Sequence, residues 1–145
     1  MARVVHGDFG FHNCLINAQS TVAAVVDWEL ATLGDPLADL GYTLNLFGES
    51  QADIDANPEM ATSVPGFPPR SVLAARYAER TGRTLEKLDY YRGFNYWKRA
   101  VIVHGVYARY MAGQKTTEGI DLNGLLQTID SSLSSAQQAV DRLEH

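Results

Sequence analysis

Three oxygen-bearing side chains near the N-terminus have the types and the spacing of a catalytic and metal-binding set. Asp8 and Asn13 lie five residues apart in a short segment between apolar stretches, and Asp27 follows the next apolar stretch. A carboxylate can accept the proton of a hydroxyl, and carboxylate and amide oxygens are ligands that Mg²⁺ prefers in proteins. The first thirty residues therefore predict proton transfer, metal binding or both.

The order of these residues also matches the arrangement used in phosphoryl transfer. There an aspartate accepts the proton of the acceptor hydroxyl, an asparagine five residues later holds metal, and a later aspartate bridges metal ions between phosphates. Two plainer interpretations remain open. Asp8 and Asn13 could be turn residues with local hydrogen bonds, and His6, His12 and Cys14 could indicate zinc, although no fourth ligand is evident.

Short β-branched segments are expected to bring these residues together. They predict strands at residues 3–5, 13–17 and 22–27, with a hairpin connection at 18–21. Because a hairpin returns the chain to its starting point, Asp27 is expected beside Asp8 and Asn13. A Gly-Asp-Pro sequence with Asp35 as the cap then predicts a helix that ends near Gly48.

The rest of the chain predicts a long loop followed by three helices. Residues 49–69 contain four of the five prolines and are expected to be a loop, and helices are expected over 70–81, 86–112 and 119–142. Within the helix expected at 86–112, His104 is expected to be a hydrogen-bonded core residue. Apolar residues that recur at intervals of three and four predict a buried face on each of the last two helices. These apolar residues are Phe94, Trp97, Val101, Ala108 and Met111, then Leu122, Leu125, Leu126, Ile129, Leu133, Ala136 and Val140.

Length and composition predict one globular domain over residues 1–142. The chain has 145 residues and one cysteine, Cys14, so an internal disulfide is excluded. No apolar run approaches the ~20 residues of a membrane span, and no secretory signal opens the chain, so we expect a cytoplasmic protein without a membrane partner. Residues 143–145 resemble the start of a polyhistidine tag.

Charge is distributed unevenly along the chain. Residues 1–60 hold nine acidic and one basic side chain, whereas residues 70–115 hold ten basic and three acidic ones. This division is compatible with a site where a metal ion and an anionic ligand meet, and equally with solvated helix faces. The net charge of −5 gives no reason to expect nucleic acid as a partner.

The motifs together resemble the aminoglycoside phosphotransferase and choline kinase superfamily, which has the protein-kinase-like fold. The resemblance depends on His6-Gly7-Asp8 with Asn13, on residues 26–29 and on Gly-Asp-Pro-Leu-Ala-Asp-Leu at 34–40. Residues 27–40 are most similar to phosphotransferase domains associated with acyl-CoA dehydrogenases. That similarity implies a hydroxyacyl thioester as one candidate acceptor, and an aminoglycoside-like acceptor is the other.

The resemblance implies a role for each matching residue. Asp8 would be the catalytic base, and Asn13 and Asp27 would bind Mg²⁺ beside ATP or another nucleoside triphosphate. His6 would support the catalytic loop, and Asp39 would accept hydrogen bonds from the backbone of that loop. Glu29 would either support the metal site or contact the substrate. The residues with these implied roles lie within 3–48, the segment expected to contain the catalytic loop, the metal-site hairpin and the first helix. The expected long loop at 49–69 and a helical subdomain at 70–142 complete the domain.

The motif order predicts that only the C-terminal lobe of such an enzyme is present. The catalytic loop begins at residue 6, and no glycine-rich phosphate loop occurs in the sequence. We therefore expect a mainly α fold with a small β-hairpin region near the N-terminus, weak activity alone, and self-association or a partner that supplies the missing N-lobe. The alternative is a non-catalytic, truncated relative that acts as a binding or oligomerisation module.

Overall fold

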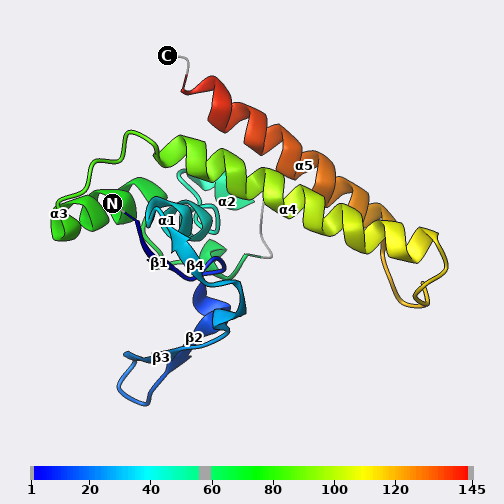
Figure 1. The fold of residues 1–145 in the computed structure, drawn as a ribbon, viewed down its shortest axis with the longest axis horizontal. Helices are drawn as coiled ribbons and strands as arrows, with labels where there is room; N and C mark the ends of the chain where they lie inside the picture. Colours follow the sequence, from blue (N-terminus) through cyan, green and yellow to red (C-terminus); the bar gives the residue numbers. More distant parts are fainter. Residues whose placement is uncertain (1, 56–59, 144–145) are drawn as a thin grey trace.

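The computed structural model describes residues 2–55 and 60–143 and shows a mainly helical fold with a small β region near the N-terminus (Figure 1). This fold class confirms the prediction and is consistent with the C-lobe of the protein-kinase-like fold. Of the predicted tag at residues 143–145, residues 144–145 lie outside the described residues. Among those described, no helix is both long and apolar enough to cross a membrane.

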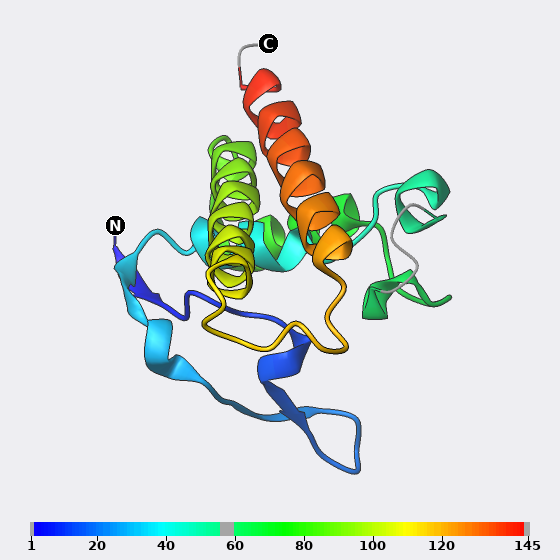
Figure 2. The ribbon, with the colours of Figure 1, turned by 90° about the vertical axis from the view of Figure 1, so that its right-hand side faces the viewer.

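Two nested antiparallel strand pairs carry the N-terminal motifs. The outer pair joins β1 (Arg3–Val5) to β4 (Thr32–Gly34), and the inner pair joins β2 (Cys14–Ile16) to β3 (Val22–Val25). Figures 1 and 2 show the β2–β3 hairpin projecting away from the helices. Strand β4 was not predicted, because three residues that include a glycine carry no readable alternation.

Helix α1 (Leu37–Leu44) begins as predicted and ends earlier than predicted. Oδ1 of Asp35 accepts a hydrogen bond from the Leu37 backbone N–H at 3.0 Å, as predicted, although Pro36 and not Asp35 is the residue in the N-cap position. The predicted end near Gly48 is wrong, because the chain leaves the helix at Asn45, whose side chain donates to the backbone carbonyl of Arg92 at 3.0 Å. Residues 45–47 form turns instead.

The prediction of a loop throughout residues 49–69 is wrong at two places. Helix α2 (Gln51–Asp55) and a 3₁₀ turn (Ala61–Ser63) interrupt the loop. The first turn of α2 is capped, because the Asp53 backbone N–H donates to the Ser50 hydroxyl at 3.2 Å and the Asp53 carboxylate accepts from the Glu49 N–H at 2.8 Å. Residues 56–59 lie outside the described part of the chain.

The three later helices are α3 (Arg70–Thr81), α4 (Leu88–Met111) and α5 (Leu122–Asp141). Helix α3 has the predicted bounds, and α4 and α5 begin two or three residues later than predicted. The start of α5 is set by Asp121, whose side chain accepts from the Gly124 N–H at 2.9 Å. Figures 1 and 2 show α4 and α5 packed against each other along their length.

The predicted buried faces of α4 and α5 are wrong in large part. Phe94, Trp97, Val101 and Met111 are 46–60% exposed. The exposed members on α5 are Leu126, Leu133 and Val140. His104 is also exposed and makes no hydrogen bond among the described residues, which corrects its placement in the core.

Small residues form the close helix contacts instead. A Cβ added at Gly93 of α4 would lie 3.3 Å from the Cβ of Ala139 of α5, and one added at Gly41 of α1 would lie 3.0 Å from the backbone of Arg92. Helices that approach this closely bury glycine and alanine at the contact and leave larger side chains outside it. Apolar periodicity reports the positions of large side chains and therefore missed the packed face.

Candidate functional site

The loop after β1 is anchored by Asp39 of α1. Its two carboxylate oxygens accept hydrogen bonds from the backbone N–H groups of His6 and Gly7, at 2.6 and 2.8 Å. Both contacts are charge-assisted and fix the start of the loop that carries Asp8. Gly7 has φ +85°, and a Cβ there would lie 2.7 Å from the carbonyl oxygen of Leu30, so this turn requires glycine.

His6 connects the loop to the strand that precedes Asp27. The imidazole is 2% exposed, its Nε2 lies 2.8 Å from the Val26 carbonyl oxygen, and its Nδ1 accepts from the Asp8 backbone N–H at 3.3 Å. The two partners together require the neutral ring with its hydrogen on Nε2. His6 thus lies inside the fold and holds the backbone on both sides of the site.

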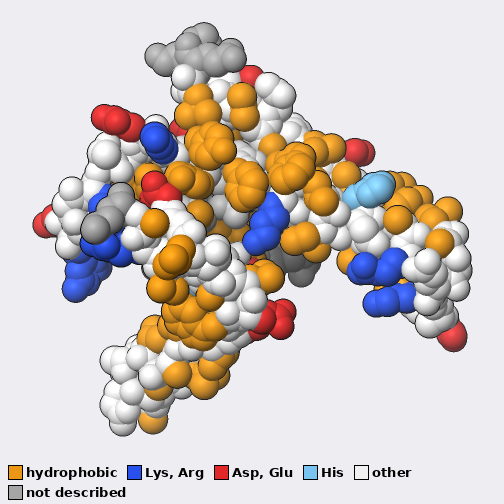
Figure 3. All heavy atoms as spheres, viewed as in Figure 1, with side chains coloured by type: hydrophobic (Ala, Val, Ile, Leu, Met, Phe, Trp, Pro, Cys, Tyr) orange, Lys and Arg blue, Asp and Glu red, His pale blue; other side chains and the backbone are white. Residues whose placement is uncertain are grey.

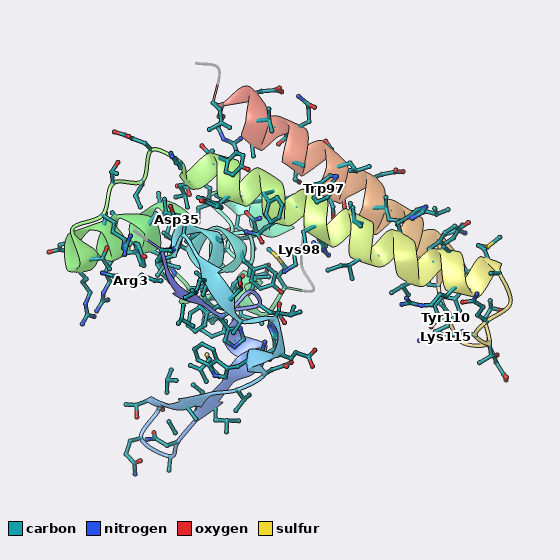
Figure 4. The ribbon with its side chains drawn as sticks, viewed as in Figure 1. Arg3, Asp35, Trp97, Lys98, Tyr110 and Lys115 are labelled. Carbon is teal, nitrogen blue, oxygen red and sulfur yellow. The ribbon has the colours of Figure 1, made fainter. Side chains whose placement is uncertain are left out.

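Two further side chains hold the loop from outside it. The Thr43 hydroxyl of α1 donates to the Phe9 carbonyl at 2.6 Å, and Nζ of Lys98 of α4 donates to the Gly7 carbonyl at 2.8 Å. Figure 4 shows Lys98 on the side of α4 that faces the N-terminal segment. Helices α1 and α4 therefore both position the residues around Asp8.

Asp8 and Asn13 are in direct contact. The Asn13 amide nitrogen donates to the backbone carbonyl of Asp8 at 2.9 Å and to its Oδ2 at 3.1 Å. Asn13 is 5% exposed, so its side chain is held in one orientation. Its Oδ1 accepts no hydrogen bond from any residue that the structure describes and remains free for a ligand.

The hairpin brings Asp27 to the same end of the site as Asn13. Cys14 pairs with Val25, and the Val26 backbone N–H donates to the Asn13 carbonyl at 2.9 Å, so Asp27 directly follows the base of the hairpin. Its backbone is left-handed, with φ 64°, a conformation that aspartate tolerates better than most residues. The Asp27 carboxylate is exposed and takes no hydrogen bond from the described residues.

Glu29 is not part of this contact network. It lies in the 3₁₀ turn Trp28–Leu30, is exposed, and makes no hydrogen bond or ion pair with a described residue. The structure therefore places His6, Asp8, Asn13 and Asp39 in one hydrogen-bonded network, with Asp27 at its edge and Glu29 two residues beyond.

The charge on Asp8 is stabilised by its neighbours. Burial raises the pKa of this carboxyl. Hydrogen bonds from Tyr42, His12 and Asn13 and the nearby His12 charge lower it, and together they outweigh burial and leave the pKa below its usual value. The reciprocal effect is large, because burial and Asp8 raise the pKa of Tyr42 well above its usual range. Asp8 is therefore ionised at neutral pH, as a group that orients a hydroxyl must be.

Sequence reasoning missed Tyr42, Thr43 and Lys98 as parts of this site. Asp39, Tyr42 and Thr43 follow helical spacing of three and four, so one face of α1 carries all three, and that spacing was a usable signal. Lys98 gave no signal, because it is 91 residues from Gly7 and lies in a run of basic residues compatible with solvated helix faces.

Oxygen donors in this site suit Mg²⁺ better than softer metals. Asn13 and Asp27 offer one amide and one carboxylate oxygen, and Mg²⁺ usually completes such a pair with water and phosphate. Within the described residues, no group of three or more His, Cys, Asp or Glu side chains could hold a metal ion. The Cys14 thiol donates to the Gly10 carbonyl at 3.4 Å.

Comparisons with known proteins agree with this geometry. Residues 1–91 match the model of the phosphotransferase enzyme family. Acyl-CoA dehydrogenase family member 11 of Gallus gallus is 34% identical over 127 residues, covering 79% of this chain and 16% of that protein. Family member 10 of Mus musculus is 30% identical over 127 residues, covering 85% of this chain and 12% of that protein.

A plant relative extends the same similarity. Probable acyl-CoA dehydrogenase IBR3 of Arabidopsis thaliana is 26% identical over 144 residues, covering 86% of this chain and 17% of that protein. This chain therefore spans less than a fifth of the length of these curated relatives. No solved structure matches.

Proposed function

Because the chain belongs to the phosphotransferase enzyme family, we propose that it carries the catalytic-base and metal-binding part of an ATP-dependent phosphotransferase. The acceptor is the hydroxyl of a small molecule. The observation that carries this proposal is the hydrogen-bonded Asp8–Asn13 pair at the base of the hairpin that returns Asp27 to it.

Asp8 is the residue that faces the acceptor in this proposal. Its ionised carboxylate accepts a hydrogen bond from the acceptor hydroxyl and orients the oxygen toward the phosphoryl group. A lowered pKa makes Asp8 a weak base, so orientation contributes more than full proton removal before transfer. The Asp39, Thr43 and Lys98 contacts keep the loop backbone in place, which limits the reorganisation needed when the substrates bind.

Asn13 and Asp27 would hold Mg²⁺, because amide and carboxylate oxygens are donors that this ion prefers. The Asn13 amide nitrogen is engaged by Asp8, which leaves Oδ1 as the free atom, and the Asp27 carboxylate has no protein partner among the described residues. The ion would neutralise charge on the phosphates of ATP. Glu29, exposed two residues from Asp27, remains a candidate for indirect support of the metal or for contact with the substrate.

We propose a hydroxyacyl thioester as the acceptor in preference to an aminoglycoside-like molecule. The support is that the relatives named above are members of the acyl-CoA dehydrogenase family. We also propose a cytoplasmic location, which the single unpaired cysteine supports.

The exposed apolar surface supports a partner or a second copy of the chain. Figure 3 shows apolar side chains gathered over α4 and along the β hairpin. They include Phe94, Trp97 and Val101 on α4 and Leu15 and Ile16 on β2, each 46–57% exposed. Surfaces of this kind mark interaction sites on soluble proteins. The same observation favours the second candidate function, a non-catalytic binding or oligomerisation module.

Calorimetric titration of Mg·ATP into the chain separates the two functions. The informative variant is Asp27→Asn, because asparagine keeps the left-handed backbone and removes the charge. The matched control is Asp130→Asn, which removes an exposed carboxylate from α5. The phosphotransferase proposal expects Mg²⁺-dependent ATP binding that Asp27→Asn weakens and Asp130→Asn preserves. Equal Mg·ATP binding by all three proteins would favour the module.

A further inference from the structure

A pocket beside the Asp8 site lies between helices α1, α3, α4 and α5, and Glu49 and Asp53 also line it. It has a volume of about 710 Å³ and is bounded by the end of α1, by α3, by the first half of α4 and by the second half of α5. Asp8, Asn13 and Asp27 do not line it. Its size falls in the range of small-molecule sites, which is roughly 300–1,000 Å³.

Four arginines and three carboxylates line this pocket, which leaves one positive charge in excess. Nη1 of Arg92 lies 2.9 Å from the Asp89 carboxylate, and Nε of Arg142 lies 3.3 Å from the same group. Arg70 is paired with two further carboxylates, Asp53 and Glu49. All three carboxylates are therefore already engaged by arginine.

Arg99 is exposed and is the arginine of this set that has no counterion among the described residues, although its charge acts on Tyr42 of the Asp8 site. It makes no hydrogen bond or ion pair with any residue in 2–55 or 60–143, and it lies on the same face of α4 as Arg92 and Tyr96. An arginine that lines a concave site and has no carboxylate of its own is suited to pair with an anion from outside the protein.

Further unused hydrogen-bonding groups line the same pocket. The side chains of Tyr96 on α4 and of Ser135 and Gln138 on α5 make no hydrogen bond among the described residues. Nε of Arg70 is buried, forms an ion pair with Glu49 at 3.7 Å and has no hydrogen-bond partner within the described part of the chain. Buried polar groups usually find a partner, so an unfilled donor in a pocket indicates a ligand.

We propose that this pocket binds the carboxylate or phosphate group of a small organic molecule. The Arg99 guanidinium forms the ion pair, and Tyr96, Ser135 and Gln138 provide additional hydrogen bonds. Paired N–H groups of a guanidinium match the two oxygens of either anion. A cationic ligand does not fit, because each lining carboxylate already has an arginine partner.

The test is an amide NMR titration of the intact chain with sodium phosphate and, separately, with sodium acetate, at constant ionic strength and without nucleotide or Mg²⁺. We expect saturable shifts at Tyr96, Arg99, Ser135 and Gln138, and the tighter of the two probes identifies the head group. Arg99→Gln should weaken that probe about tenfold, equal to about 1.4 kcal/mol. Arg109→Gln, an exposed arginine outside the pocket on the same helix, should leave its affinity unchanged.

Three results would overturn the proposal. They are shifts that do not saturate with either probe, saturable shifts that fall outside the pocket, and equal weakening by the Arg99 and Arg109 variants. The spectrum of each variant without anion shows whether it is folded, and Ser135→Ala provides a second, milder variant that should weaken binding less than Arg99→Gln. Because neither nucleotide nor Mg²⁺ is present, the outcome is independent of the proposed phosphotransferase activity.

Discussion

Replacing Asp39 by alanine should destabilise the protein and loosen the loop that carries Asp8. The wild-type carboxylate accepts from the backbone N–H groups of His6 and Gly7, and His6 is almost fully buried. Alanine leaves both donors unpaired, and each lost partner costs about 1–3 kcal/mol. The expected loss is therefore about 2–6 kcal/mol, a large share of the roughly 5–15 kcal/mol that stabilises a typical domain.

Urea unfolding followed by far-ultraviolet circular dichroism measures this loss. Asp130→Ala, which removes an exposed carboxylate from α5, is the matched control and should change the free energy of unfolding by less than about 0.5 kcal/mol. Asp39→Asn should fall between the two, since one oxygen remains to accept one of the two hydrogen bonds. A loss below about 1 kcal/mol for Asp39→Ala would refute the reasoning, because it would mean that the two N–H groups find other partners.

Three further predictions concern the supports of the site and its charge. Gly41→Ala should lower the melting temperature, because its Cβ would lie 3.0 Å from the backbone of α4. The control Gly105→Ala has open space around the new Cβ and should raise the melting temperature; thermal unfolding measures both variants, and equal shifts would contradict the packing. Lys98→Met should speed amide exchange across residues 6–13 by removing the bond to the loop, and unchanged exchange would show that α1 alone is sufficient. Because the pKa of Asp8 is lowered on folding, its stabilising contribution is present above the unfolded pKa of 3.8 and is lost as the pH falls through the folded pKa. Asp8→Asn should therefore make the free energy of unfolding fall less steeply at acid pH, and an unchanged slope would contradict the lowered pKa.

Local sequence signals predicted the parts of the structure that depend on near neighbours. The β2–β3 hairpin and the bond from Leu37 to Asp35 join residues close in the chain, and so does the Asp8–Asn13 hydrogen bond, which the sequence offered as the plainer alternative of turn residues with local bonds. Turn chemistry and strand alternation are written into such short segments, so spacing was enough to find them. The roles of Asp8, Asn13 and Asp27 in catalysis and metal binding stay predictions that the experiments above address.

Packing between distant segments could not be predicted in the same way. Periodicity assigned Phe94 and Trp97 to a buried face, but the close contact of α4 with α5 uses Gly93 against Ala139 instead. A small residue is compatible with exposure, burial or a helix contact, so its sequence position alone does not distinguish them. Contacts such as that of Lys98 with the loop became visible only when the helices were placed in space.

The supports of the loop and the packing of the helices depend on one another. Asp39 and Thr43 hold the loop from α1, and Lys98 holds it from α4, so the three contacts can form together only at one separation of the two helices. Gly41 sets that separation, because it lies directly against the α4 backbone. A side chain at position 41 would therefore move Lys98 away from the loop while Asp39 and Thr43 stayed in place. The geometry around Asp8 thus depends on the contact between α1 and α4, in which Asn95 also donates to the Ala38 carbonyl at 2.9 Å.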